Sequence, residues 1–201
     1  MFNDLIVEYK TMIDAELVNI YNDGPKLLKK PINHIILGGK RLRPILCMLT
    51  AKSFNGNEKK SLICSVSIEL LHIFSLVHDD IMDNDILRHG TKTIHSKWNI
   101  PIGILSGDAI LALALIHLNR LTQNKNLIIE KFNAALIKVC EGQALDKEFE
   151  TKSTVDISEY LNESLEPCNA SSDSLIAGYG IDCPTALSSC ANSFIEKTTA
   201  Y

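Results

Sequence analysis

Residues 69–85 read ELLHIFSLVHDDIMDND, an apolar run that ends in four aspartates within seven positions. Asp79, Asp80 and Asp83 form a DDxxD pattern within it. Acidic side chains near the C-terminal part of a helix oppose the helix dipole, which favours cations there. Clustered carboxylates also repel one another unless a cation lies between them. The stretch therefore indicates a long helix that ends in a cation-binding site.

Helical spacing places Asp79 and Asp83 one turn apart on the same face, with Asp80 at its edge. His72 lies seven residues before Asp79, so it projects from the same stripe two turns earlier. Magnesium binds few carboxylates, keeps several waters and bridges to phosphate groups. The pattern predicts such a magnesium site. The alternative is an acidic helix end that is merely solvated.

A second stretch, GGKRLRP, covers residues 38–44. Its two glycines let the backbone turn, and Lys40, Arg41 and Arg43 follow at once. Pro44 disfavours the helical conformation for Arg43, so we expect Arg43 to be extended beside the N-terminus of the next helix. A Walker loop is excluded because GxxxxGK[ST] is missing. The stretch predicts an anion site, and the alternative is a basic surface loop.

Helical periodicity dominates the remaining sequence, and strand alternation is nearly absent. We expect helices over residues 2–22, 25–37, 44–54, 58–87, 104–121 and 126–150. Pro44 is expected at the first position of the third helix. Thr154 or Asp156 would cap a further helix beginning VDISEYL. The fold class predicted is all-α.

Composition limits the classes of protein that fit. Of the 201 residues 46% are hydrophobic and 22% charged, as in ordinary globular proteins, and a net charge of −4 argues against a general nucleic-acid binder. MFNDLIVEYK lacks the basic lead and apolar run of a signal peptide. ILSGDAILALALIHL is interrupted by Asp108 and is shorter than the roughly 20 apolar residues of a spanning helix, so we expect no transmembrane segment.

Six cysteines occur without a CxxC pair or a paired His/Cys spacing, which argues against a zinc site. Cys47, Cys64 and Cys140 stand in apolar helical contexts, where a thiol behaves as a small hydrophobic group. We expect them to be buried. Free thiols fit a reducing compartment, so a cytoplasmic location is expected.

Four stretches in this order, GGKRLRP, ELLHIFSLVHDDIMDND, LSGDAILALA and EGQALDKEF, resemble the trans-polyprenyl diphosphate synthases. The resemblance covers about residues 1–161 and is closest to the archaeal-type geranylgeranyl and farnesyl diphosphate synthases. It implies the N-terminal portion of an isoprenoid-synthase-type helical bundle, a homodimer when intact, and Mg²⁺-dependent joining of an allylic diphosphate to isopentenyl diphosphate. Terpene cyclases share an aspartate cluster but lack the GGKRLRP element.

The resemblance assigns roles to two groups of residues. Those that would hold the diphosphate of isopentenyl diphosphate are Lys40, Arg43 and His72. Those that would hold the allylic diphosphate and its magnesium are Asp79, Asp80, Asp83, Arg88, Gln143 and Asp146, with the metal on Asp79, Asp83 and Asp146. By position alone His72 also fits a core histidine, Gln143 a surface glutamine, and Asp108 a structural hydrogen-bonding group near a helix start.

The sequence departs from the family pattern after the aspartates. The family has Arg-Arg-Gly there, with the second arginine on isopentenyl diphosphate, whereas this chain has Arg88-His89-Gly90. His89 offers a weaker, pH-dependent charge and no guanidinium fork, so we expect weaker binding of that substrate. Lys92 also replaces a usual proline.

The C-terminal sequence departs further. Residues 162–193 contain no Lys, Arg or His, and we expect this insert-like segment to be poorly ordered. SFIEKTTAY, residues 193–201, resembles the family's Lys-Thr segment, in which Lys197 and Thr198 would bind substrate, and we expect residues 194–201 to be a remnant of that helix. The sequence has no second aspartate-rich motif. The alternative to an enzyme is therefore a non-catalytic diphosphate-binding fragment or partner subunit.

Product length is the last implication of the resemblance. In the family, bulky side chains just before the first aspartate motif limit how far the growing prenyl chain extends. Phe74 and Ser75 lie five and four residues before Asp79. An aromatic residue at the fifth position and a small one at the fourth resemble the geranylgeranyl synthases. The alternative is that Phe74 packs in the core.

Overall fold

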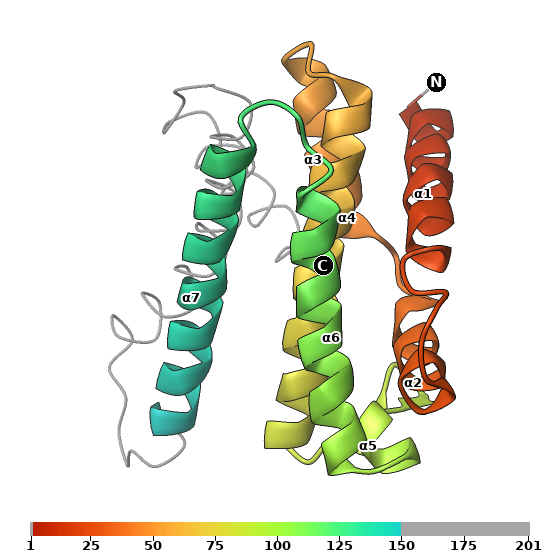
Figure 1. Ribbon diagram of the computed structural model, residues 1–201, viewed down its shortest axis with the longest axis vertical. Coiled ribbons are helices and arrows are strands. Elements are labelled where there is room, and N and C mark those ends of the chain that lie inside the picture. Colours follow the sequence, from red (N-terminus) through yellow and green to blue (C-terminus); the bar gives the residue numbers. More distant parts are fainter. Residues whose placement is uncertain (1, 150–201) are drawn as a thin grey trace, which may run out of the picture. The chain divides into compact units, whose positions relative to one another are not determined.

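The computed structural model describes residues 2–149, and its contacts divide the chain into two units between Gln123 and Asn124. The first unit contains α1 (Phe2–Val18), α2 (Lys26–Ile36), α3 (Leu42–Ser53), α4 (Glu58–Met82), β1 (Leu87–Arg88), β2 (Thr91–Lys92), α5 (Ile94–Lys97) and α6 (Ile100–Leu118) (Figure 1). The second contains α7 (Lys125–Phe149), which we describe by itself. The described chain is mostly helical, as its periodicity predicted.

The core of the first unit is built around α4. This helix packs most extensively against α6 and next against α3, and α6 runs beside it in Figure 1. Val66 and Leu70 of α4 and Ile110 of α6 are fully buried. Asn57 caps the start of α4 by accepting a hydrogen bond from the Lys60 backbone N–H. A rigid central helix therefore carries the aspartate motif at its C-terminal end.

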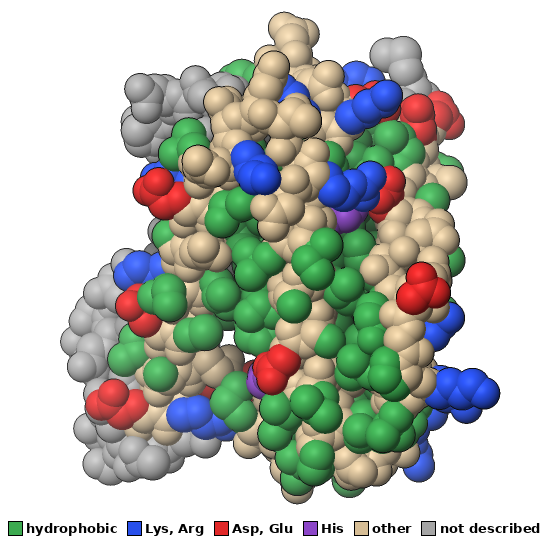
Figure 2. All heavy atoms as spheres, in the orientation of Figure 1, with side chains coloured by type: hydrophobic (Ala, Val, Ile, Leu, Met, Phe, Trp, Pro, Cys, Tyr) green, Lys and Arg blue, Asp and Glu red, His purple; other side chains and the backbone are tan. Residues whose placement is uncertain are grey.

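Both central helices are long and apolar enough to cross a membrane by length and composition. Core helices of globular bundles meet the same criterion, and 56% of the most apolar window of α4 is buried inside the structure. The corresponding window of α6 is 39% buried. Figure 2 shows hydrophobic side chains over α6, whose exposed residues include Ile100, Ile104, Leu105 and Ile116.

The prediction that the aspartate helix extends to Leu87 is wrong. α4 ends at Met82, and Asn84 has a left-handed φ of 57° that breaks the helix. Leu87–Arg88 pairs antiparallel with Thr91–Lys92. His89 and Gly90 form the turn with φ values of 51° and 78°, as two-residue hairpin turns require. Arg88 therefore lies on a hairpin strand.

The GGKRLRP stretch also differs from expectation. α3 begins at Leu42, so Arg43 is helical and Pro44 is the third helical residue. Proline is tolerated there because the first N–H groups of a helix have no acceptor within the helix. The left-handed residue is instead Arg41, with φ 55°.

Two smaller predictions were also tested, and a third falls outside the described residues. The first helix ends at Val18, before the predicted Asn22. α6 begins at Ile100, capped by the Asn99 side chain, so Asp108 lies within the helix and not near its start. The division of the chain at residues 161 and 193 stays a prediction, because Thr154, Asp156 and residues 162–193 and 194–201 lie outside the described residues.

The cysteines agree with expectation in two of three positions. Cys47 and Cys64 are buried free thiols. Burial raises the pKa of Cys64 to about 11, and it raises the pKa of Cys47 further above its ordinary value. Cys140, expected to be buried, is exposed on α7. The helical stripe on which that expectation rested does not specify which side of α7 is covered.

Candidate functional site

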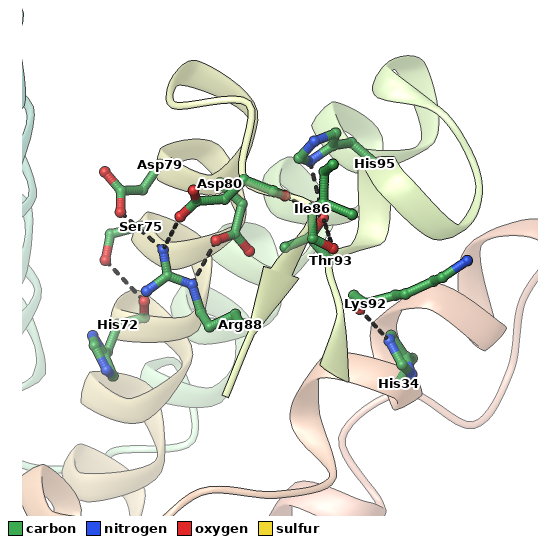
Figure 3. Close-up of polar contacts among 11 residues, drawn as sticks. His34, His72, Ser75, Asp79, Asp80, Ile86, Arg88, Lys92, Thr93 and His95 are labelled. Carbon is green, nitrogen blue, oxygen red and sulfur yellow. Dashed lines mark hydrogen bonds and ion pairs between the residues drawn. The ribbon is translucent and has the colours of Figure 1, made fainter. Parts of the chain in front are cut away.

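The end of α4 and the hairpin bring one arginine onto the aspartate motif (Figure 3). Arg88 Nε donates to Asp80 Oδ1 at 2.5 Å, and its Nη2 donates to Asp79 Oδ2 at 3.2 Å. The same Nη2 lies 3.7 Å from Asp85 Oδ2. One guanidinium thus contacts three carboxylates. If all three are ionised, two negative charges remain, which suits a divalent cation.

Burial separates the first two aspartates. Asp80 is 1% exposed, whereas the Asp79 side chain is 28% exposed. Burial raises the pKa of Asp80, although the hydrogen bond and charge of Arg88 act in the opposite direction. The pKa of Arg88 is raised, since its bonds to Asp80 and the nearby carboxylates outweigh its own desolvation. Asp80 is therefore the buried anchor of the guanidinium, and Asp79 is the accessible carboxylate.

The hairpin that carries Arg88 is fixed at its base by two contacts. Thr93 Oγ1 donates to the carbonyl of Asp85 at 2.7 Å, which ties β2 to the end of α4. On the other side, His34 Nε2 of α2 donates to the carbonyl of Lys92 at 2.8 Å (Figure 3). These contacts set the position from which Arg88 reaches the aspartates.

His72, two turns before Asp79 on α4, forms a second pair with Arg43 of α3. Arg43 Nη1 lies 3.2 Å from His72 Nε2. Because a guanidinium can only donate, Nε2 accepts this bond and is unprotonated. Burial, followed by the charges of Arg43 and Arg88, lowers the pKa of His72 to about 4. The pair is therefore a neutral imidazole that orients an exposed cation.

Arg41, between Lys40 and Arg43, has a different role. It is 4% exposed, and its guanidinium donates to Asp14 at 2.7 Å, to Glu69 at 2.9 Å and to the carbonyl of Ile36 at 2.5 Å. These bonds tie α1, α2 and α4 to the start of α3. Lys40, by contrast, is exposed. The motif thus combines one structural arginine with two cations at the surface.

The two residues expected to limit product length contact different neighbours on α4. Phe74 is half-buried, and its ring centroid lies 4.6 Å from that of His78. Ser75 Oγ donates to the carbonyl of His72 at 2.8 Å. A Cβ atom at Gly107 of α6 would overlap the His78 ring, and Asp108 Oδ1 lies 3.4 Å from His78 Nε2. His78 thus links Phe74 to α6.

The residues predicted to bind magnesium supply the right donors. Asp79 is partly exposed, and Asp83 is exposed at the C-cap of α4, so the one-turn spacing expected between them is present. Within residues 2–149 no three His, Cys, Asp or Glu side chains converge as a preformed metal cluster. Arg88 instead contacts the first two aspartates. The carboxylate oxygens of these aspartates are donors that fit magnesium. In the described structure the carboxylates of Asp79 and Asp80 bond the Arg88 guanidinium.

Two predicted residues belong to the second unit, which we describe by itself. Gln143 and Asp146 lie on α7, three positions apart and so about one turn along the helix. Their assignment to the allylic side stays a prediction. His89 is exposed at the hairpin turn. Lys197 and Thr198 lie outside the described residues.

Sequence reasoning missed the contacts of Asp85, the buried pairing of Arg41 with Glu69, and the role of His78. Asp85 follows the DDxxD, and its contact with Arg88 depends on a hairpin that periodicity did not predict. Gly107 was the available signal for His78, because a glycine inside a helical pattern often marks close packing.

The model of one protein family, polyprenyl synthetase, matches residues 25–166, which is more than half of the chain. The chain belongs to the polyprenyl synthetase family. The family match confirms the resemblance carried by the four sequence stretches. The chain also matches crystal structures: one titled geranylgeranyl pyrophosphate synthase has a TM-score of 0.81 at 33% identity, covering 88% of this chain and 56% of that one.

Relatives in the polyprenyl synthetase family include two archaeal proteins. A geranylgeranyl diphosphate synthase of Sulfolobus acidocaldarius is 35% identical over 188 residues, covering 88% of this chain and 56% of the relative. A geranylgeranyl pyrophosphate synthase of Geoglobus acetivorans is 34% identical over 166 residues, covering 80% and 52%. The chain thus spans about half the length of the curated relatives it matches.

Proposed function

We propose that the chain forms the diphosphate-binding part of a magnesium-dependent prenyl diphosphate synthase, which joins an allylic diphosphate to isopentenyl diphosphate. The observation that carries this proposal is the convergence of Arg88 on Asp79 and Asp80. The Arg43–His72 pair supplies a second cationic group, since His72 lies on the same helix as the aspartates. Membership in the polyprenyl synthetase family supports the reaction class.

The side chains of the chain have distinct tasks in this proposal. Arg43 and Lys40 bind the diphosphate of isopentenyl diphosphate, and neutral His72 keeps Arg43 directed toward it. Arg88 binds the allylic diphosphate, with Gln143 completing that side. Asp79, Asp83 and Asp146 would hold magnesium, which when bound neutralises charge on the departing diphosphate.

The allylic carbocation formed when the diphosphate leaves must be protected from water. The double bond of isopentenyl diphosphate attacks this cation, and a proton is lost. Phe74 offers a half-buried aromatic side chain on α4, five residues before Asp79, with its ring against that of His78. We propose a geranylgeranyl product, because Phe74 is bulky and the adjacent Ser75 is small. The names of the Sulfolobus and Geoglobus relatives support this choice.

Incorporation of radiolabelled isopentenyl diphosphate into hexane-extractable products tests the proposal. The purified chain is incubated with an allylic diphosphate and magnesium, beside an Asp79→Ala variant. Product that disappears in the variant supports the synthase. Incorporation that Asp79→Ala leaves unchanged contradicts it.

A second candidate is a diphosphate-binding module or partner subunit without turnover. The sequence contains one DDxxD motif, so it supplies aspartates from one side of the allylic diphosphate. Calorimetric binding of isopentenyl diphosphate without any incorporation supports this candidate, and turnover by the purified chain excludes it. We further propose that the protein is cytoplasmic and forms a homodimer. Analytical ultracentrifugation can test the dimer, and cell fractionation can test the location.

A further inference from the structure

A hollow of about 730 Å³ lies between one face of α2 and the end of α5, apart from the aspartate cluster. Its lining includes Lys26, Lys29, Lys30, His34, Lys97 and Trp98. The α2 residues recur at helical spacing, so they line one face of that helix. Figure 2 shows Lys and Arg side chains projecting along the edge occupied by α2.

Two of the four lysines of this hollow, Lys29 and Lys97, are held by neutral groups. Lys97 Nζ lies 4.9 Å from the centroid of the Trp98 ring and 3.3 Å from His34 Nδ1. Lys29 Nζ donates to the carbonyl of Asn22 at 2.6 Å. No carboxylate is among the described residues that line the hollow. Four ammonium groups gathered in this way attract an anion, because their mutual repulsion falls when it binds.

His34 positions one of these ammonium groups as a neutral partner. Its Nε2–H donates to the carbonyl of Lys92, so Nδ1 carries the lone pair that faces Lys97. The imidazole therefore orients the Lys97 ammonium without bringing a negative charge into the hollow. The His34 and Trp98 rings meet edge to face, with centroids 5.4 Å apart, and form an aromatic wall beside the lysines.

We infer that this hollow binds the phosphate end of an amphiphile, with the ammonium groups on the phosphate and the Trp98 ring against the adjoining apolar part. The phosphate belongs either to a free phosphorylated ligand or to the headgroup of an anionic lipid. The site is separate from the DDxxD. The hairpin carries Arg88 toward α4, whereas its Lys92 carbonyl is bound from α2 (Figure 3).

Trp98 is the one tryptophan of the sequence, so its fluorescence reports on this hollow directly. We expect a saturable change in emission when the full chain is titrated, without magnesium, with sodium diphosphate or with phosphatidylcholine vesicles containing phosphatidylglycerol. A response to diphosphate identifies a free ligand as sufficient. A response to the vesicles alone identifies the lipid surface as the source.

Matched variants separate this site from the others. Lys26→Ala combined with Lys97→Ala should weaken binding about tenfold, whereas Lys59→Ala, at an exposed lysine on α4, should leave the midpoint unchanged. Arg43→Gln should keep the response, because Arg43 belongs to the proposed substrate site. Unchanged emission with both probes overturns the inference. So does an unchanged midpoint in the double variant, or a response lost in Arg43→Gln.

Discussion

Replacing Arg41 by Met tests whether this arginine of the GGKRLRP stretch stabilises the fold, in contrast to Lys40 and Arg43, which we propose bind diphosphate. The guanidinium is 4% exposed and donates three hydrogen bonds, so the variant leaves Glu69, 6% exposed, as a buried carboxylate without this partner. Asp14 loses less, because Lys10 still lies 2.5 Å from it. Methionine preserves the unbranched stem. Removing one member of a buried ion pair costs about 3–5 kcal/mol, and the Lys10 contact places our expectation at about 3–4 kcal/mol.

Urea unfolding followed by Trp98 fluorescence measures this loss, since Trp98 lies in the same unit. Lys40→Met is the matched control and should change the free energy of unfolding by less than about 0.5 kcal/mol. Adding Glu69→Gln to Arg41→Met should restore about 1–2 kcal/mol, because the buried charge is removed. Arg43→Met should instead weaken diphosphate binding. An Arg41→Met variant as stable as Lys40→Met would refute the structural role of Arg41.

Three further predictions concern the site. The pKa of His72 falls from 6.5 to about 4 on folding, so the unfolded state takes up the proton first as the pH is lowered. The stability of the fold should therefore decrease as the pH falls from about 6.5 to 4. In His72→Asn the urea midpoint should depend less steeply on pH in this range. Gly107→Ala should destabilise by about 1–2 kcal/mol in urea titrations, and an added His78→Ala should relieve the overlap. Phe74→Ala should lengthen the product, read by chromatography of dephosphorylated prenyl alcohols, while Ser75→Ala should not; an unchanged distribution would place the limit at another residue.

The sequence predicted those features that depend on local patterns. The spacing of apolar residues located the helices, and α2 was predicted to within one residue at each end. The DDxxD and GGKRLRP stretches directed attention to the end of α4 and the start of α3, and the chemical roles of their residues stay a prediction. Both are continuous segments whose residue types limit what they can bind.

Features set by tertiary contacts were not predictable in the same way. Residues 83–88 contain apolar side chains at spacings that also fit a helix, and the left-handed Asn84 decides against it. Arg41 and Arg43 are both arginines beside glycines, and only their partners show that one is structural. Cys140 has an apolar neighbourhood in sequence, yet it is exposed, because periodicity does not identify the covered side of α7.

The hairpin turn gives a physical reason for histidine at position 89. His89 adopts φ 51°, a region in which histidine is found more often than most non-glycine residues, and Gly90 adopts φ 78°. This turn places β1 so that Arg88 reaches Asp80, while the His89 side chain is exposed. The backbone conformation at position 89 therefore helps to place Arg88 against the aspartates, even though the His89 side chain carries no guanidinium. In the function that we propose, the missing second arginine would weaken the binding of isopentenyl diphosphate, whereas the Arg88–Asp80 contact is present.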